Sequence, residues 1–211
     1  MDCTSKPQSS AKLFITSAPS GAGKSSLNAT LLKRDATLKM SVSFTTRAPR
    51  KGEIDGKDYN FVTLEEFNER KAAGEFLETA LVHGNFYGTS RIWIEEQLKK
   101  GVSVILEIDW QGAKQVKKIF PDAVTIFILP PSMEILEKRL RGRGTDSEEV
   151  IEKRLAGAAL EISQAPHFEY VIVNDDFETA SDDLYAIARS ARLTFATQKI
   201  AKKETFTSFG L

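Results

Sequence analysis

The sequence has little cysteine and no net charge, and each shortage excludes a class of protein. Cys3 is the one cysteine among 211 residues, so an internal disulfide framework is excluded. The 29 basic and 29 acidic side chains cancel, whereas proteins that bind nucleic acid through its phosphates usually carry a strongly basic balance. We therefore expect no nucleic-acid partner, and a site for polyanions must gather a few cations locally.

Long apolar segments are also missing. No apolar run approaches the roughly 18 residues that a membrane span needs, and residues 1–11 lack the apolar stretch of a secretory signal. We therefore expect a cytoplasmic protein without a membrane partner, in which residues 1–11 form a disordered tail. The length suits one α/β core with small additions but is short for two independent domains.

Apolar runs alternate with helical segments along much of the chain, which is typical of a parallel sheet covered on both faces by helices. We expect strands at 12–17, 102–108, 123–129 and 169–173 and helices at about 24–34, 132–140, 145–164 and 178–199. Ser132 is the expected N-cap of the second helix, and Thr145 with Glu148 has the spacing of a capping box. From Lys202 onward we expect a loosely ordered tail.

Residues 41–89 have a different texture, because short β-rich runs alternate there with polar turns. One short helix interrupts them, and Thr63 with Glu66 three residues later is the capping-box signal of its start. The pattern predicts a small β-rich insertion in the α/β core.

A glycine-rich segment, APSGAGKS, joins the first expected strand to the first expected helix. A P-loop requires Gly, four free residues and then Gly-Lys-Ser/Thr; Gly23, Lys24 and Ser25 match, and Ala18 replaces the first glycine. The backbone N–H groups of such a turn and the following helix N-terminus converge on an anion. Lys24 would reach the β- and γ-phosphates of a nucleotide, and Ser25 would hold Mg²⁺. The alternative is a glycine-rich turn without a phosphate-binding role, in which the lysine occurs by chance.

Asp109 follows the expected strand at 102–108. A carboxylate at the C-terminal edge of a strand beside a P-loop can organise Mg²⁺ or its water shell. Asp109 can equally cap a helix that begins in the following segment, QGAKQVKKIF. The two roles are compatible.

Five further segments, taken together with the P-loop, resemble the guanylate kinase family. They are SVSFTTRAPRKGEIDGKDYNFV (41–62), EFLETALVHGNFYGTS (75–90), ILEIDWQG (105–112), RLRGRGT (139–145) and VIVNDD (171–176). The resemblance covers roughly residues 12–196. It implies an α/β protein with the P-loop nucleoside monophosphate kinase fold: a parallel sheet flanked by helices, a small GMP-binding insertion and a mobile lid. The implied activity is ATP-dependent phosphorylation of GMP to GDP, with dGMP as a further acceptor, in purine nucleotide metabolism.

The resemblance also implies a division of the chain. Residues 12–211 would form one domain, whose core takes in 12–40, 90–138 and 155–200. The GMP-binding insertion would occupy about 41–89, and the lid about 139–154.

The insertion would bind GMP through its phosphate and its base. Arg47 and Arg50, three apart in TTRAPR, would clamp the phosphate, because arginine forks suit bidentate contacts with phosphate. Tyr59 and Tyr87 would add phenolic donors. Taken singly, each of the four could instead be a surface arginine or a core tyrosine.

Glu78, with Ser43 and Thr89 beside it, would select guanine. Guanine presents N1–H and the N2 amino group as adjacent donors and O6 as an acceptor, so a carboxylate can accept from both donors while a hydroxyl donates to O6. Adenine would leave a buried Glu78 unpaired, and sites of this kind discriminate by roughly 10⁴ or more. Asp109 joins the expected GMP contacts. Without the resemblance, Glu78 could be an exposed strand carboxylate.

The remaining implied contacts belong to ATP. Arg143 lies between two glycines in RGRGTD, and it would fold over the ATP phosphates together with Arg139 and Arg154. Asn174 would help to place the adenosine end or the lid. The expected ATP contacts are these residues and the loop Ala18, Pro19, Ser20, Gly21, Ala22, Gly23, Lys24 and Ser25.

The implied chemistry needs no general base, because the acceptor oxygen of GMP is already anionic. His83 and His167 lie in contexts that do not suggest one. The task is to bring two polyanions together, which positioning and charge neutralisation accomplish. The expected catalytic residues are Lys24, Arg47, Arg143 and Arg154, and the expected cofactor with ATP is Mg²⁺, held by Ser25 and Asp109.

Three other functions are compatible with parts of the sequence. A non-catalytic scaffold domain of the same fold is disfavoured by the intact Lys24 and Ser25. A regulatory GTPase would use the Asp-x-x-Gly pattern at 109–112, but no Asn-Lys-x-Asp motif accompanies it. A nucleotide kinase with another acceptor, such as AMP, is the third. The expected partners are the small molecules ATP and GMP, and a homo-oligomer stays an open option.

Overall fold

The computed structural model describes residues 10–82, 84–142 and 147–211, and a parallel sheet forms its centre. Within these residues five strands pair in the order β2-β7-β1-β8-β9, and each pairing is parallel. The strands are β1 (Leu13–Ser17), β2 (Leu38–Met40), β7 (Ser103–Glu107), β8 (Val124–Leu129) and β9 (Tyr170–Val173). The predicted parallel core sheet is confirmed, although the short edge strand β2 was missed.

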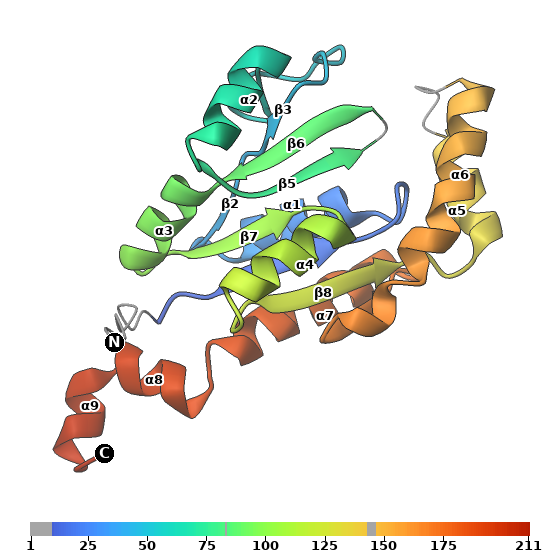
Figure 1. Ribbon diagram of the computed structural model, residues 1–211. Coiled ribbons are helices and arrows are strands. Elements are labelled where there is room, and N and C mark those ends of the chain that lie inside the picture. Colours follow the sequence, from blue (N-terminus) through green and yellow to red (C-terminus); the bar gives the residue numbers. More distant parts are fainter. Residues whose placement is uncertain (1–9, 83, 143–146) are drawn as a thin grey trace.

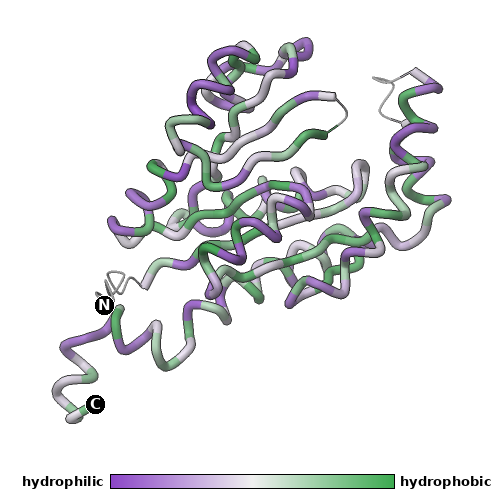
Figure 2. Tube along the Cα trace, in the orientation of Figure 1, coloured by the Kyte–Doolittle hydropathy of each residue, from purple (hydrophilic) through white to green (hydrophobic). Residues whose placement is uncertain are grey.

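Alternate residues of β1 face two separate hydrophobic clusters, one on each side of the sheet. Phe14 packs in one cluster with Leu184, and Ile15 packs in the other with Val116. The covering helices are α1 (Lys24–Arg34) and α7 (Phe177–Ala191) on the first side and α3 (Arg91–Lys99) and α4 (Trp110–Ile119) on the second. Figure 2 shows the hydrophobic residues running along the central strands. The P-loop and the strand ends are therefore held on a rigid, buried support.

A second sheet stands beside the first (Figure 1). Its strand order is β4-β3-β6-β5, with β5 and β6 antiparallel. The elements are β3 (Phe44–Thr45), β4 (Asn60–Phe61), β5 (Phe76–Val82), β6 (Asn85–Ser90) and the helix α2 (Leu64–Ala72). Phe67 of α2 stacks on Phe76 with ring centroids 4.7 Å apart, and Thr63 caps α2 by accepting from Glu66 N. The β-rich segment and its helix start occur where the sequence predicts them.

The helices α5 (Met133–Gly142) and α6 (Glu148–Ile162) pack on each other through Leu136, Leu140, Ile151 and Ala158. Ser132 caps α5 as expected, because its hydroxyl accepts from Ile135 N at 3.2 Å. The expected start of the following helix at Thr145 was wrong. The N-cap of α6 is Ser147, whose extended backbone precedes two acidic residues in the first turn, a favourable arrangement at the positive end of a helix. Thr145 itself lies outside the described residues.

The C-terminal region differs from its prediction. Instead of one helix over 178–199, α7 ends at Ala191 and α8 (Phe195–Ala201) begins anew. Thr194 makes the break, because its hydroxyl accepts from Thr197 N and caps α8. Beyond Lys202, where a loose tail was expected, α9 (Lys203–Ser208) forms a further helix. Figure 1 shows α8 and α9 extending away from the two sheets. A single turn of 3₁₀ helix, η1 (Ala165–His167), precedes β9.

Candidate functional site

The P-loop lies between β1 and α1, where it was predicted. Gly21 and Gly23 have φ of 95° and 96°, a left-handed backbone that glycine adopts without a steric penalty. Asn174, at the end of β9, donates from Nδ2 to Ala22 O at 2.7 Å. A Cβ at Gly23 would come within 2.3 Å of the same Nδ2. Asn174 therefore braces the loop through its hydrogen bond to Ala22. Its side chain lies so close to position 23 that only glycine fits there.

Lys24 and Ser25 open α1 at the carboxyl ends of β1 and β7. The Lys24 ammonium donates to Ile108 O at 3.3 Å. The Ser25 hydroxyl donates to Glu107 Oε1 at 2.5 Å, and Asn28 Nδ2 donates to Glu107 Oε2 at 2.9 Å. Glu107 is thus the carboxylate in contact with Ser25, and the sequence analysis missed it in favour of Asp109.

Asp109 has the capping role that the sequence left open. Its carboxylate accepts from Gly112 N at 2.8 Å and so begins α4. The residue also lines the cavity described next, so capping does not remove it from the site.

A cavity of about 460 Å³ lies between the P-loop, the second sheet and α6. Fifteen of the predicted residues line it: Ala18, Pro19, Ser20, Gly21, Gly23, Lys24 and Ser25 from the P-loop, Glu78 and Tyr87 from the second sheet, Ser43, Arg47, Arg50 and Tyr59 from the segments beside its strands, and Asp109 and Arg154. Ala22, Thr89 and Asn174 are buried. Arg143 lies outside the described residues. Side chains from three distant parts of the sequence therefore meet around one space that could hold two nucleotides.

Glu78 is the buried carboxylate of this cavity. It lies on β5 with 4% of its surface exposed, and Thr89 on the paired strand β6 donates to its Oε1 at 2.6 Å. Burial raises the pKa of Glu78 to about 7; the Thr89 hydrogen bond opposes this rise, and the nearby Asp109 charge adds to it. A Cβ at Gly112 would come within 2.7 Å of Glu78 Oε2. The N-terminus of α4 therefore packs tightly against the carboxylate.

The guanidinium of Arg47 lies among aromatic rings at the other end of the second sheet. Its central carbon is 5.3 Å from the ring centroid of Tyr59 and 5.8 Å from that of Phe61. The Tyr59 and Tyr87 rings meet edge to face at 5.9 Å. Burial raises the pKa of Tyr59 above its usual value, so its hydroxyl stays a donor. One cation and two phenols thus line the cavity wall together.

A family model described as guanylate kinase matches residues 10–191. This protein belongs to the guanylate kinase family. It is 55% identical over 186 residues to the guanylate kinase of Aromatoleum aromaticum, covering 88% of this chain and 91% of that protein. It is 51% identical over 199 residues to the guanylate kinase of Paraburkholderia xenovorans, covering 94% and 88%. The crystal structure of guanylate kinase from Anaplasma phagocytophilum matches with a TM-score of 0.76 at 40% identity over 90% of each chain. The expected P-loop nucleoside monophosphate kinase fold is confirmed.

Two of the predicted arginines contact the P-loop or the residue that supports it. Arg154 of α6 donates to the Ser20 hydroxyl at 3.0 Å. Arg139 of α5 donates from Nη2 to Asn174 O at 2.9 Å, while its buried Nη1 has no hydrogen-bond acceptor within the part of the chain that the structure describes. A buried donor without an acceptor is costly, and an incoming polar ligand could supply one.

Glu161 of α6 is a further carboxyl group in the same cavity. Burial raises its pKa, while Lys24, the Ser20 backbone N–H and Arg154 act to lower it. The carboxylate lines the cavity. Burial therefore outweighs the attraction of the nearby cations at this carboxyl group.

The expected Mg²⁺ would need oxygen ligands near the P-loop. Within residues 10–82, 84–142 and 147–211, no group of three or more His, Cys, Asp and Glu side chains could hold a metal ion. Mg²⁺, however, typically uses one or two carboxylates with water and substrate phosphates rather than an all-protein cage. Ser25, Glu107 and Asp109 provide oxygens of that kind. The donor set fits Mg²⁺ that arrives with a nucleotide.

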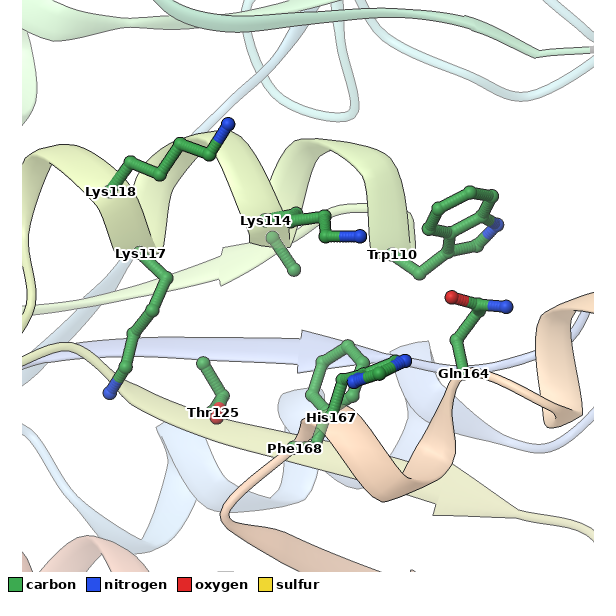
Figure 3. A pocket seen from close by; sticks show the side chains of 9 residues that line it. Trp110, Lys114, Lys117, Lys118, Thr125, Gln164, His167 and Phe168 are labelled. Atoms are coloured by element: carbon green, nitrogen blue, oxygen red, sulfur yellow. The ribbon is translucent and has the colours of Figure 1, made fainter.

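A second cavity of about 310 Å³ lies against α4, η1 and β8 (Figure 3). Trp110, Lys114, Gln164 and His167 point toward one another there. Lys117 is engaged elsewhere, because its ammonium donates to Ala123 O at 2.7 Å and to Glu169. None of the predicted nucleotide contacts lines this cavity, which separates it from the candidate site.

None of the helices in the described part of the chain combines the length and hydrophobicity of a membrane span.

Proposed function

We propose that this protein transfers the γ-phosphate of ATP to GMP and so forms GDP and ADP. The observation that carries the proposal is the shared cavity, in which the P-loop lysine Lys24, the arginine Arg47 and the buried carboxylate Glu78 all line one space. A P-loop alone predicts that a nucleotide binds but not which second substrate is used. The buried Glu78–Thr89 pair would recognise guanine.

GMP would bind with its base at Glu78 and its phosphate at Arg47 and Arg50. The ionised Glu78 carboxylate can accept from guanine N1–H and N2–H, and Ser43 lies in the same wall to donate to O6. Tyr59 and Tyr87 would donate to the phosphate. Guanine would supply the donors that Glu78 lacks beside Thr89. Adenine lacks both donors, so the carboxylate would keep only the Thr89 hydrogen bond and the base would be rejected.

ATP would bind with its phosphates in the P-loop. An oxygen of the GMP phosphate attacks the γ-phosphorus, a new P–O bond forms, and the bond to the β,γ-bridging oxygen breaks with its electron pair leaving on ADP. Lys24 and the arginines neutralise the charge that spreads over the transferring group. Ser25, with Glu107 and Asp109, would hold Mg²⁺, which when bound supplies charge neutralisation at the β- and γ-phosphates.

Residues at about 139–154 would act as a lid that closes when both nucleotides are bound. Arg154 already reaches the P-loop through Ser20, and closure would bring it to the phosphates. A closed lid excludes water as a competing acceptor. The check is ATP hydrolysis without GMP, which we expect to be far slower than turnover with GMP; equal rates would contradict a lid that closes on both substrates.

The test of the function is a comparison of acceptors. ADP formation from ATP and Mg²⁺ is followed with GMP, dGMP, AMP and UMP at equal concentrations. We expect turnover with GMP and dGMP and at least about 10⁴-fold lower kcat/KM with AMP. Equal turnover with AMP or UMP would instead favour a nucleotide kinase of another specificity, and no turnover with any acceptor would favour a scaffold.

A further inference from the structure

We propose that Glu53 is a positioning residue for the GMP phosphate, acting through Arg47 and the turn that follows it. This inference rests on the proposed function. Glu53 Oε1 accepts from Arg47 Nη2 at 2.8 Å, and its other oxygen accepts from the backbone N–H of Arg50 at 2.7 Å. One carboxylate thus joins both arginines of the predicted phosphate clamp, one through its side chain and the other through its backbone.

Glu53 supports the wall of the cavity and does not form part of it. Arg47 and Arg50 are lining residues, whereas Glu53 is not among the described residues that line the cavity. The Arg47 and Glu53 side chains are 13% and 19% exposed, so the pair is shielded from water. Shielding strengthens an ion pair relative to one at the surface. The carboxylate is therefore placed to hold Arg47 without lining the space for the phosphate.

The rest of the Arg47 side chain is fixed as well. Its Nη1 donates to Ala48 O at 2.8 Å, and its backbone N–H donates to Thr45 Oγ1 at 3.1 Å. A turn with Gly52 at φ of 92° brings Glu53 N back to Arg50 O at 3.1 Å. A guanidinium that is held before the ligand arrives loses less conformational freedom on binding. Glu53 therefore favours GMP binding by pre-organising Arg47.

The ion pair persists at neutral pH. The hydrogen bond from Arg47 lowers the pKa of Glu53, with a further contribution from the Arg50 backbone N–H. Glu53 also lies close enough to compete with the GMP phosphate for Arg47. The two roles predict opposite results, because loss of a competitor would tighten GMP binding and loss of a support would weaken it.

The experiment compares E53Q with the parent enzyme and with E75Q. Glu75, just before β5, pairs with Arg70 of α2 at 2.9 Å and is not among the described residues that line the cavity, so E75Q is the matched control. For E53Q we expect the KM for GMP to rise about tenfold, as for the loss of one charged hydrogen bond, with kcat and the KM for ATP within about threefold. E75Q should match the parent in all three.

A second readout isolates the phosphate. Guanosine carries the base without the phosphate, so calorimetric binding of guanosine should be the same for E53Q and the parent, whereas GMP binding should weaken. In an R47K background, E53Q should add less than about twofold, because the guanidinium that it positions is gone. E53D, which keeps the charge, serves if E53Q melts before the assay temperature, and it should raise the KM for GMP less than E53Q does.

The outcomes separate the two proposals. A parent enzyme without GMP turnover would overturn the proposed function itself. An active parent with an unchanged or lowered KM for GMP in E53Q, or with an equal loss of guanosine binding, would overturn the role of Glu53 alone.

Discussion

Replacement of Glu78 by glutamine tests the base-reading carboxylate through stability as well as through activity. The pKa of Glu78 is raised from 4.5 to about 7, mainly by burial. The folded chain therefore binds this proton more tightly than the unfolded chain does. The contribution to stability is fully present below about pH 4.5 and is lost as the pH rises through about 7.

The size of the effect follows from the shift. One pKa unit corresponds to about 1.4 kcal/mol, so the parent chain should lose on the order of 3 kcal/mol across this range. By pH 5.5 about 1 kcal/mol is already lost, and by pH 8.5 the loss is complete. E78Q has no such titration, and its amide oxygen can still accept from Thr89. The free energy of unfolding of E78Q relative to the parent should therefore rise by about 2 kcal/mol between pH 5.5 and pH 8.5.

Urea unfolding of both proteins without nucleotide, at the two pH values, measures this difference, and the titrations of other groups cancel in it. In parallel, the KM for GMP should rise about 100-fold in E78Q, because the amide presents a donor to a donor of guanine, while the KM for ATP changes less than about twofold. A stability difference that does not change with pH would refute the buried, titrating carboxylate. Equal effects on GMP and ATP would refute base reading.

Three other predictions follow from the site. Guanosine, which lacks a titrating phosphate, should bind the parent about tenfold more weakly at pH 6 than at pH 8, because only ionised Glu78 accepts both base donors; calorimetry checks this, and a flat profile would count against it. K24A should reduce kcat by about 10³-fold or more with an unchanged melting temperature; near-parent turnover would remove the P-loop assignment. G23A should lower the free energy of unfolding by about 2–3 kcal/mol, because φ is 96° and the new Cβ meets Asn174, and N174A should partly rescue it; a neutral G23A would contradict the close approach of Asn174 to position 23.

Local signals predicted part of this structure well. The start of α1 at Lys24 and the caps Thr63 and Ser132 lie where the sequence placed them, because a P-loop, a capping spacing and a Pro-Pro pair act over a few residues. The break between α7 and α8 at Thr194 was not predicted, because the apolar pattern of α7 continues into α8 and only the cap geometry separates the two helices.

Roles that depend on strand pairing were harder to predict. The choice between Glu107 and Asp109 as the partner of Ser25 depends on the register of β1 and β7, in which Thr16 pairs with Glu107. That register is set by tertiary packing, so no local sequence pattern indicates it. Asn174 contacts Ala22, which is far away in the sequence, and Glu53 contacts Arg50 across a tight turn. Both contacts depend on how the backbone folds. The sequence could suggest Asn174 only through the family resemblance, and it gave no signal for Glu53.

The most direct test of the central claim, that Glu78 reads guanine in the cavity that holds Lys24, is the ratio of kcat/KM for GMP to kcat/KM for IMP. IMP keeps N1–H and O6 but lacks the 2-amino group, so it removes one of the two donors that the carboxylate would accept. We predict that GMP is preferred by about 100-fold in the parent and by less than about fivefold in E78Q. Equal use of GMP and IMP by the parent enzyme would contradict the account.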